Sequence, residues 1–235
     1  MKTVVVLQSN YIPWKGYFDL IHDADLFIFY DDLQFTKNDW RNRNKVKTPK
    51  GAEWITIPVG TNAHRLICEV EIKDSSWQTK HWKAIQQFYG KCPYFTRYQA
   101  FFEDAYLGRQ WLNLSVLNQH LIRTISSDFL SLATEFRDSR EYDLSGQKLE
   151  RLLELVTKAE ADRYVTGPAA KDYIESSRFA DAGIELVWKD YSGYPEYPQR
   201  FPPFEHGVSI LDLLFNVGPD APWYIWGWRD GTLAP

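Results

Sequence analysis

Polar side chains with hydrogen-bonding groups gather directly after the first apolar run of the chain, residues 4–7. The set consists of Gln8, Asn10, Tyr11, Trp14, Lys15 and Tyr17. A turn needs few such groups in order to fold, so their density favours a ligand site. Pro13 is expected to open a helix whose first N–H groups favour an anion such as phosphate. The alternative is a connection that binds nothing, because the GxGxxG and GxxxxGKS/T motifs are absent.

A basic stretch, residues 37–50, could also bind phosphate. It carries six cations interleaved with asparagines and one tryptophan. Arginine can hold a phosphate or a carboxylate with two hydrogen bonds. The members that we expect to contact a ligand are Trp40, Arg41, Arg43 and Asn44. The alternative is a solvated loop that leads into a β-hairpin, with its turn at Lys50-Gly51.

A second turn of the same kind follows the short strand expected over residues 163–166. Gly167 and Pro168 are expected to open a helix there, and its first turns carry Lys171 and Tyr173. The free N–H groups at the start of a helix favour contact with phosphate or substrate. The alternative is a plain connection between a strand and a helix.

These groups need a scaffold, and the apolar periodicity along the chain predicts one. Strands are expected over residues 4–7, 26–30, 54–59, 68–72, 134–140, 163–166 and 184–190. Helices are expected after Pro13 and over residues 75–89, 93–107, 112–132 and 148–160. The alternation predicts an α/β fold, an open, mostly parallel, Rossmann-like sheet with helices on both faces. Ligands bind at the carboxyl edge of such a sheet, where the three polar sets would meet.

The composition changes after residue 190. Residues 191–207 are rich in proline and aromatic rings, so we expect no regular structure there but an ordered lid or wall over the sheet edge. We therefore expect an α/β domain over residues 1–190 and a lid with a C-terminal helix over residues 191–235.

A short helix is expected after Ser209, ending at Gly218-Pro219. Asp212 in this helix is expected to face outward, with a buried carboxylate as the alternative. The tryptophan-rich tail, residues 222–231, is expected to pack on the body of the protein or on a second copy of the chain, as a homo-oligomer.

Charge and cysteine content exclude several classes of protein. The net charge is −4 and the pI about 5.8, so the overall field does not attract DNA or an anionic membrane surface. Cys68 and Cys92 form no CxxC motif, which argues against structural zinc, and we predict no metal site. The N-terminus lacks the apolar length of a signal peptide or membrane span, so we expect a cytoplasmic protein without membrane insertion.

Several long segments resemble one bacterial family. They are QSNYIPWKGYFDLI, ADLFIFYDDLQFTKNDWRNRNKVKT, WITIPV, KHWKAIQQFYGKCPYF, YVTGPAAKDYI and SILDLLFNVGP. Together they span nearly the whole chain and resemble the WbqC-like family. Its members are typically encoded with O-antigen and other surface-polysaccharide genes, including aminotransferases that make deoxyamino sugars. The resemblance implies work on a nucleotide-linked amino sugar.

A second resemblance concerns the fold. The first strand, polar turn, helix and second strand are similar to the start of nucleotidylyl-transferase-like domains, in which a His-containing motif in the turn binds the ATP phosphates. The turn here reads NYIPWKGY and has no histidine. Lys15, Asn10 and the basic stretch could supply the same electrostatic stabilisation.

The family resemblance implies a transferase that forms an amide on the amino group of a nucleotide-linked deoxyamino sugar, in O-antigen and lipopolysaccharide biosynthesis. The group transferred would be acyl or aminoacyl, such as glycyl. Asp32 or Asp31 would act as the base or orient the amine, with His81 as the competing base or a packed residue. Phosphates would be held by Lys15, Arg41, Arg43 and Lys171, and Gln8, Asn10 and Tyr11 would orient the substrate.

The donor stays open: it is ATP with Mg²⁺ or an activated acyl or aminoacyl compound. One alternative function is a nucleotidyl or glycosyl transferase, which is weakened because Asp31-Asp32 is the nearest approach to a DxD metal motif. The other is a non-catalytic assembly factor that binds a sugar nucleotide.

Overall fold

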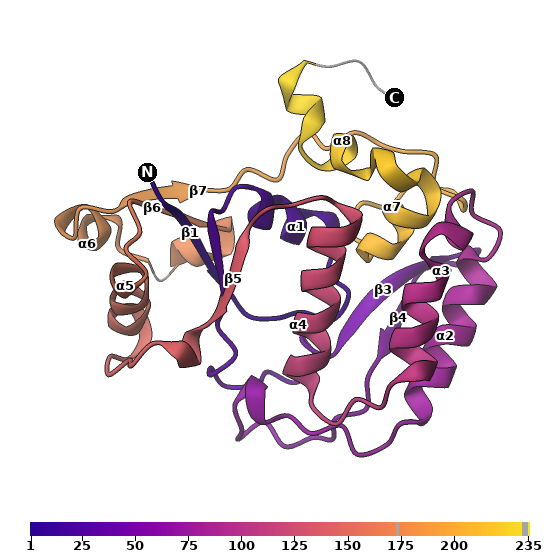
Figure 1. Ribbon diagram of the computed structural model, residues 1–235, viewed down its shortest axis with the longest axis horizontal. Coiled ribbons are helices and arrows are strands. Elements are labelled where there is room, and N and C mark those ends of the chain that lie inside the picture. The colour runs from indigo at the N-terminus through magenta and orange to yellow at the C-terminus, as the bar shows by residue number, and fades with distance from the viewer. Residues whose placement is uncertain (173, 232–234) are drawn as a thin grey trace.

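The protein is described by a computed structural model that covers residues 1–172, 174–231 and 235. Its central sheet has five parallel strands in the order β5-β2-β1-β6-β7. They are β1 (Thr3–Leu7), β2 (Leu26–Phe29), β5 (Glu135–Asp138), β6 (Arg163–Thr166) and β7 (Glu185–Trp188). Helices lie on both sides of the sheet (Figure 1). The prediction of an open, parallel α/β sheet is confirmed.

The strand order reverses at β1. The chain adds β2 and β5 on one side of β1, then returns and adds β6 and β7 on the other side. At such a switch point the connections leave two neighbouring strands in opposite directions and open a crevice at the carboxyl edge. The loop after β1 therefore lies where ligands bind in folds of this kind.

The larger core lies on one face of the sheet. Val5 and Phe27 point into it, as do residues of α1 (Lys15–His22) and α4 (Leu114–Thr124). Because successive strand residues point to opposite faces, their neighbours serve a second core.

The smaller core lies on the other face. Val4 and Leu26 pack there against α5 (Lys148–Lys158) and α6 (Ser176–Asp181). Burial of both faces explains why the strands read as continuous apolar runs rather than alternating ones.

A long insertion between β2 and β5 supplies much of the larger core. It begins with the antiparallel hairpin of β3 (Arg43–Thr48) and β4 (Gly51–Thr56), whose turn lies close to the predicted position. The helices α2 (Ser76–Tyr89), α3 (Phe95–Glu103) and α4 follow. α3 and α4 each continue into a π-helical turn, Asp104–Gly108 and Ile125–Phe129.

The strand expected over residues 68–72 does not form, so that prediction is wrong. Ile67–Glu69 is a 3₁₀ turn, and a single bridge joins Glu71 to Asn113. Val70 and Ile72 are buried. Their alternation reflects an extended connection anchored beside the start of α4, because none of the described strands lies beside it to complete a ladder.

The region after β7 packs on the larger core. As expected, residues 191–207 form neither helix nor strand. Ser209 caps α7 (Ile210–Val217), its Oγ accepting a hydrogen bond from Leu211 N at 3.3 Å. Gly218 ends that helix at a φ of +59°, where the Tyr94 ring leaves no space for a Cβ atom. The short helix α8 (Ala221–Ile225) follows.

Asp212 is buried, and the expectation that it faces outward is wrong. Every residue of α7 is buried, and the Asp212 side chain is 1% exposed. Its carboxylate accepts hydrogen bonds from Tyr197 Oη at 2.7 Å and Gln199 Nε2 at 2.8 Å. Both partners belong to residues 191–207, which cover the helix face that solvent would otherwise meet. Burial raises the pKa of the carboxyl group.

The helix expected directly after Gly167 begins later than predicted. Pro168–Asp172 is a 3₁₀ turn, and regular helix starts only at Ser176. Among the described residues, no helix has both the length and the apolar character needed to cross a bilayer.

Candidate functional site

The loop between β1 and α1 is held in a strained shape. Ile12 has a φ of +35°, which a β-branched residue rarely adopts. Asn44 Nδ2 compensates by donating to the carbonyls of Tyr11 and Ile12, at 3.0 and 2.9 Å. Tyr17 Oη donates to Gln8 O at 3.0 Å. Asn44, Tyr11 and Tyr17, which we expected to contact a ligand, therefore shape the loop from within.

Arg41 joins the loop after β1 to the basic stretch. Its Nη2 donates to Gln8 Oε1 at 2.8 Å, and its Nη1 donates to Asn10 Oδ1. Its own carbonyl accepts from Asn118 Nδ2 at 2.8 Å. Three of the predicted residues, Gln8, Asn10 and Arg41, thus meet at the carboxyl edge, because β1 and β2 are neighbours and run in parallel.

Asp31 and Asp32 follow β2 but have different surroundings. Asp31 is fully buried and accepts hydrogen bonds from Ser9 N at 2.7 Å, from Ser115 Oγ and from Gln119 Nε2 at 3.3 Å. Its oxygens are enclosed by groups that position the loop after β1. The arrangement identifies Asp31 as a structural anchor of the site.

Asp32 is part of a pair with Arg151 of α5, whose Nη2 lies 2.5 Å from its Oδ2. Ser139 Oγ also donates to it, at 2.5 Å. The Arg151 guanidinium carbon lies 5.7 Å from the centre of the Tyr30 ring. Asp32 is therefore a salt-bridged carboxyl group at the carboxyl edge, close to the Tyr30 ring.

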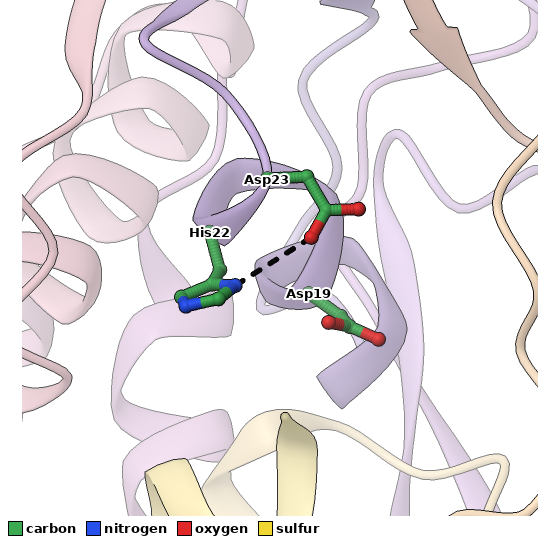
Figure 2. A group of neighbouring side chains, drawn as sticks. All are labelled: Asp19, His22 and Asp23. Carbon is green, nitrogen blue, oxygen red and sulfur yellow. Dashed lines mark ion pairs between the residues drawn. The ribbon is translucent and has the colours of Figure 1, made fainter. Parts of the chain in front are cut away.

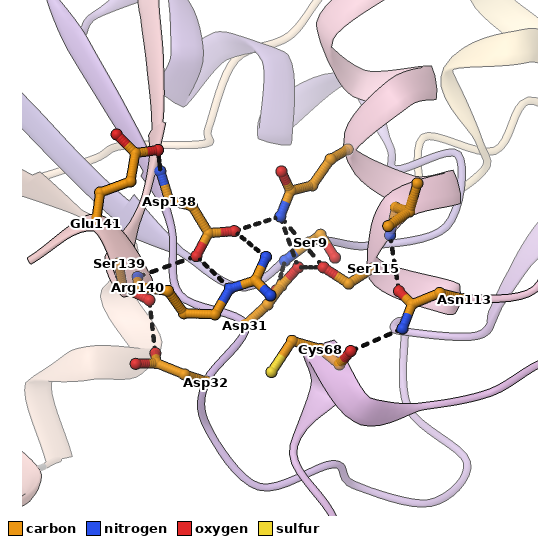
Figure 3. Close-up of polar contacts among 12 residues, drawn as sticks. Ser9, Asp31, Asp32, Cys68, Asn113, Ser115, Asp138, Ser139, Arg140 and Glu141 are labelled. Atoms are coloured by element: carbon orange, nitrogen blue, oxygen red, sulfur yellow. Dashed lines mark hydrogen bonds and ion pairs between the residues drawn. The ribbon is translucent and has the colours of Figure 1, made fainter.

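The carboxylate cluster consists of Asp31, Asp32 and Asp138 (Figure 3). Asp138 accepts two hydrogen bonds from the Arg140 guanidinium, both at 2.8 Å, one from Arg140 N at 3.0 Å, and one from Gln119 Nε2 at 2.8 Å. Burial alone would raise the pKa of Asp138, but the hydrogen bonds from Arg140 and Gln119 outweigh it and lower the pKa. Asp138 and Gln119, which the sequence did not single out, thus tie β5 and α4 to the site.

Cys68 points toward the same cluster in Figure 3. Its backbone N–H donates to Asp31 O at 2.8 Å. Burial raises the pKa of its thiol, with Arg140 acting in the opposite direction. Cys68 is therefore a protonated thiol at neutral pH and not an activated nucleophile.

His81 lies in the larger core, on α2. Its side chain is 6% exposed, and its Nδ1 forms a hydrogen bond with Tyr11 Oη at 2.9 Å. The Trp77 ring centre lies 5.1 Å away. Burial lowers the pKa of His81 to about 4, so the ring is neutral at pH 7. These contacts support the packed role rather than that of the competing base.

A cavity of about 540 Å³ opens at the switch point, and we call it the switch-point cavity. Its walls are formed by Val6, Tyr30, Leu33, Leu149, Leu152 and Tyr164. Polar groups at its rim come from Gln8, Lys148, Thr166 and Glu175. Among the predicted residues that the structure describes, Gln8 alone lines it. The lining residues from β6, from α5 and from the segment before α6 were missed, because only the strand order brings them beside β1.

A second cavity, of about 370 Å³, is lined in part by the loop after β1. We call it the tryptophan cavity, and it is lined by Asn10, Pro13, Trp14, Trp40, Asn44 and Gly207. Four of these were predicted ligand contacts. Gly207 comes from the end of the proline-rich segment, which therefore closes part of the cavity.

The first turn of α1 is covered, in contrast to the open helix N-terminus that we expected. A Cβ atom on Gly16 would lie 2.3 Å from Trp14 Cζ2, so the indole packs directly on this turn. Ser209 pairs with Trp14 in a bridge, and Ile210 N donates to Pro13 O at 2.9 Å. An anion cannot reach these N–H groups because the indole and the start of α7 occupy the approach.

Lys15 is buried beneath the proline-rich segment, with 3% of its surface exposed. Its Nζ donates to Pro195 O at 3.4 Å and lies 4.9 Å from the centre of the Tyr194 ring. Burial lowers its pKa to about 8, although Asp212 and Asp19 act in the opposite direction. Lys15 thus contacts aromatic rings where we expected phosphate.

The remaining predicted cations also contact aromatic rings. The Arg43 guanidinium carbon lies 4.2 Å from the Trp54 ring centre, and Lys171 Nζ lies 5.6 Å from the Trp188 ring centre. Gly167 faces Tyr191, whose Oη would lie 3.3 Å from an added Cβ. Tyr173 lies outside the described residues.

Asp19, His22 and Asp23 are close enough to offer ligand atoms to one metal ion (Figure 2). The Asp19 oxygens are already used: Lys189 Nζ, Arg229 Nη2 and Tyr194 Oη lie 2.8, 2.8 and 2.5 Å away. We call Asp19 with these three partners the tail lock. Two cations at the carboxylate make it a salt-bridge cluster that fastens the C-terminal region to α1.

Comparison with known proteins gives a relative and a family. The chain is 45% identical over 227 residues to an uncharacterized protein of Mycobacterium tuberculosis, Rv1507c, covering 96% of this chain and 98% of that protein. No solved structure matches. The WbqC-like protein family matches residues 8–224, which contain the loop after β1, the tryptophan cavity and α7. The resemblance seen in the sequence is confirmed, and the chain belongs to the WbqC-like protein family.

Proposed function

We propose that the chain is a transferase that binds a nucleotide-linked deoxyamino sugar at the carboxyl edge of its sheet and forms an amide on the sugar's amino group. The switch-point cavity carries this proposal. Its volume of about 540 Å³ lies within the range of about 300–1,000 Å³ that is typical of small-molecule sites. The association implied by the family resemblance, with O-antigen and other surface polysaccharides, points to an amino sugar as the ligand.

The lining of the switch-point cavity suits a sugar. Tyr30 and Tyr164 offer aromatic surface, while Gln8 and Thr166 offer amide and hydroxyl groups for sugar hydroxyls. Glu175 adds a carboxylate that can hold an ammonium group. A cavity with apolar walls and few polar groups is the usual form of a specific small-molecule site.

Amide formation requires the sugar amine to lose its proton, because only the neutral amine attacks a carbonyl carbon. The amine nitrogen then forms the new C–N bond, the bond from the carbonyl carbon to the leaving group breaks, and a base takes the proton. Asp32 is the carboxylate we assign to orient the amine and accept this proton, since Leu33 next to it lines the cavity. Asp31 is enclosed and keeps a structural role. The acyl donor is an activated acyl or aminoacyl compound.

Binding and turnover are tested separately. A thermal-shift screen with UDP- and dTDP-linked amino sugars should raise the apparent stability by about 2.7 kcal/mol at a ligand concentration of 100 Kd. Incubation with acyl donors, and with amino acids plus ATP and Mg²⁺, should yield a product whose mass reports an amide. Binding without any product would favour a non-catalytic assembly factor, and transfer of the nucleotide would favour a nucleotidyl transferase.

Asp32→Asn tests the assigned base. Turnover should fall by at least the about 10²-fold that general bases typically contribute, while sugar-nucleotide binding persists. Asp143→Asn, an exposed position outside the carboxylate cluster, is the control and should retain full turnover. Full turnover by Asp32→Asn would remove this carboxylate from the mechanism.

We also propose a cytoplasmic location. Cys68 and Cys92 are free thiols, as proteins of a reducing compartment usually keep them.

A further inference from the structure

One arginine, Arg41, is hydrogen-bonded to two residues that line different cavities. Gln8 lines the switch-point cavity and Asn10 lines the tryptophan cavity. The Arg41 guanidinium donates to both side chains, through Nη2 to Gln8 and through Nη1 to Asn10. A ligand long enough to reach from one cavity to the other would therefore pass this guanidinium.

We propose that the tryptophan cavity binds the nucleobase of the nucleotide-linked sugar, that Arg41 binds its diphosphate, and that the sugar extends into the switch-point cavity. This rests on the proposed function for the identity of the whole ligand. It adds which end of that ligand occupies which cavity, and it places the sugar amine on the side of Asp32.

The lining of the tryptophan cavity suits a flat heterocycle. Trp14 and Trp40 contribute indole surface, and stacking on such surface is sequence-tolerant because every base has a π-face. Trp40 keeps 41% of its surface exposed, although an indole usually seeks burial. Asn10 Oδ1 accepts a hydrogen bond from Arg41, so Asn10 Nδ2 is the group that can donate to an acceptor on the base. Gly207 has no side chain to fill the space.

The surroundings of Arg41 suit a diphosphate. Its two closest partners are neutral amide oxygens, and the nearest carboxylate oxygen, Asp39 Oδ2, is 3.7 Å away. Its charge is thus only weakly compensated, although its side chain is just 13% exposed. Arginine with two donors at fixed spacing matches phosphate oxygens. Arg43, two residues on, is instead turned onto Trp54.

Calorimetric titration with UDP, dTDP, CDP and GDP, and with the corresponding nucleosides, tests the base site. Trp40→Ala should lower the affinity for the best-binding nucleotide by about 5- to 150-fold, the effect of losing one stacking partner. Leu112→Ala is the control, because Leu112 is a large exposed apolar residue that lines neither cavity. It should leave the affinity unchanged.

Gly207→Leu tests the same site without removing a tryptophan. A Cβ atom at this position would meet only the Glu205 carboxylate, at 3.1 Å, so the larger side chain can be accommodated and would fill the cavity. We expect nucleotide binding to be lost while the melting temperature is kept. Unchanged binding by this variant would place the nucleobase elsewhere.

Arg41→Gln and Arg43→Gln form a matched pair that tests the diphosphate. Arg41→Gln should lower the affinity for nucleoside diphosphates by about 10- to 150-fold, because a hydrogen bond to a charged group is lost. The affinity for nucleosides should not change. Arg43→Gln should change neither. An equal loss for nucleosides and diphosphates would show that Arg41 only shapes the loop.

The outcomes separate this inference from the proposed function. If Trp40→Ala binds nucleotides as tightly as the wild type, the base site is overturned and the transferase proposal still holds. Trp40-dependent nucleotide binding without any amide product supports the base site and overturns the transferase proposal. Failure of every nucleotide to bind overturns both.

Discussion

Asp31 and Asp19 are both fully buried carboxylates, and the difference between their partners separates the two regions of the molecule. Asp31, at the carboxyl edge, accepts hydrogen bonds from neutral groups, a backbone N–H, a hydroxyl and an amide. Asp19, in the tail lock, is met by the cations Lys189 and Arg229 and by a tyrosine hydroxyl.

The comparison separates cations that stabilise the fold from a cation that can bind a ligand. In the tail lock the cations form ion pairs with the Asp19 carboxylate, so the cluster has a structural role. At the carboxyl edge the buried Asp31 accepts hydrogen bonds from neutral groups, and Arg41 donates to two amide oxygens, with its nearest carboxylate oxygen, on Asp39, 3.7 Å away. A site for an anionic ligand needs this second arrangement.

Asp19→Asn should produce the largest loss of stability, because it leaves Arg229 without its anion and leaves Lys189 only Asp23, whose Oδ2 lies 2.7 Å from Nζ. Breaking one partner of a buried ion pair costs about 3–5 kcal/mol. Urea denaturation measures the free energy of unfolding, and Asp181→Asn, an exposed acid on α6, is the control and should have no effect. A loss below about 1 kcal/mol would mean that the tail lock is not a tight cluster.

Lowering the pH should reduce the stability of the protein through His81, which contacts Tyr11 of the loop after β1. Its pKa is about 4 in the folded protein against an ordinary value of 6.5, so its contribution to stability is present above pH 6.5 and is lost as the pH falls toward 4. The shift corresponds to about 3 kcal/mol.

Urea denaturation at pH 7 and pH 4.5 tests this pH dependence. His81→Phe should be less sensitive to acid than the wild type, because it has no buried imidazole to protonate. His64→Phe, at an exposed histidine, should retain the wild-type sensitivity. Parallel pH profiles for wild type and His81→Phe would contradict the assignment.

Asp31→Asn should produce the smallest loss, about 1–3 kcal/mol, the cost of leaving one buried polar group unpaired. The new amide keeps one acceptor for Ser9 N but faces Gln119 with a donor. Because the loop after β1 depends on this anchor, we expect nucleotide affinity to fall more than stability. Calorimetric titration beside urea denaturation measures both, and a stability loss equal to that of Asp19→Asn would erase the contrast between the two carboxylates.

Elements with a strong local signal were predicted well. β6 matches residues 163–166, and α2 closely matches the expected helix, because a buried strand reads as an apolar run and a helix as a repeat of three to four residues. The alternation of such elements was sufficient for the fold class. The strand predicted over residues 68–72 does not form, because alternating apolar and polar residues also occur in an extended connection that buries one side.

The sequence by itself determined the sheet, its helices and the polar character of the loops at its carboxyl edge, since these depend on local periodicity and turn chemistry. Only the tertiary structure decided which of two adjacent carboxylates is enclosed, because Asp31 is held by Ser115, 84 residues away, whereas Asp32 pairs with Arg151, 119 residues away. It likewise decided that Arg41 donates to one residue of each cavity while Arg43 packs on Trp54. Side-chain partners from distant segments give residues of the same type different environments, and local sequence carries no record of those partners.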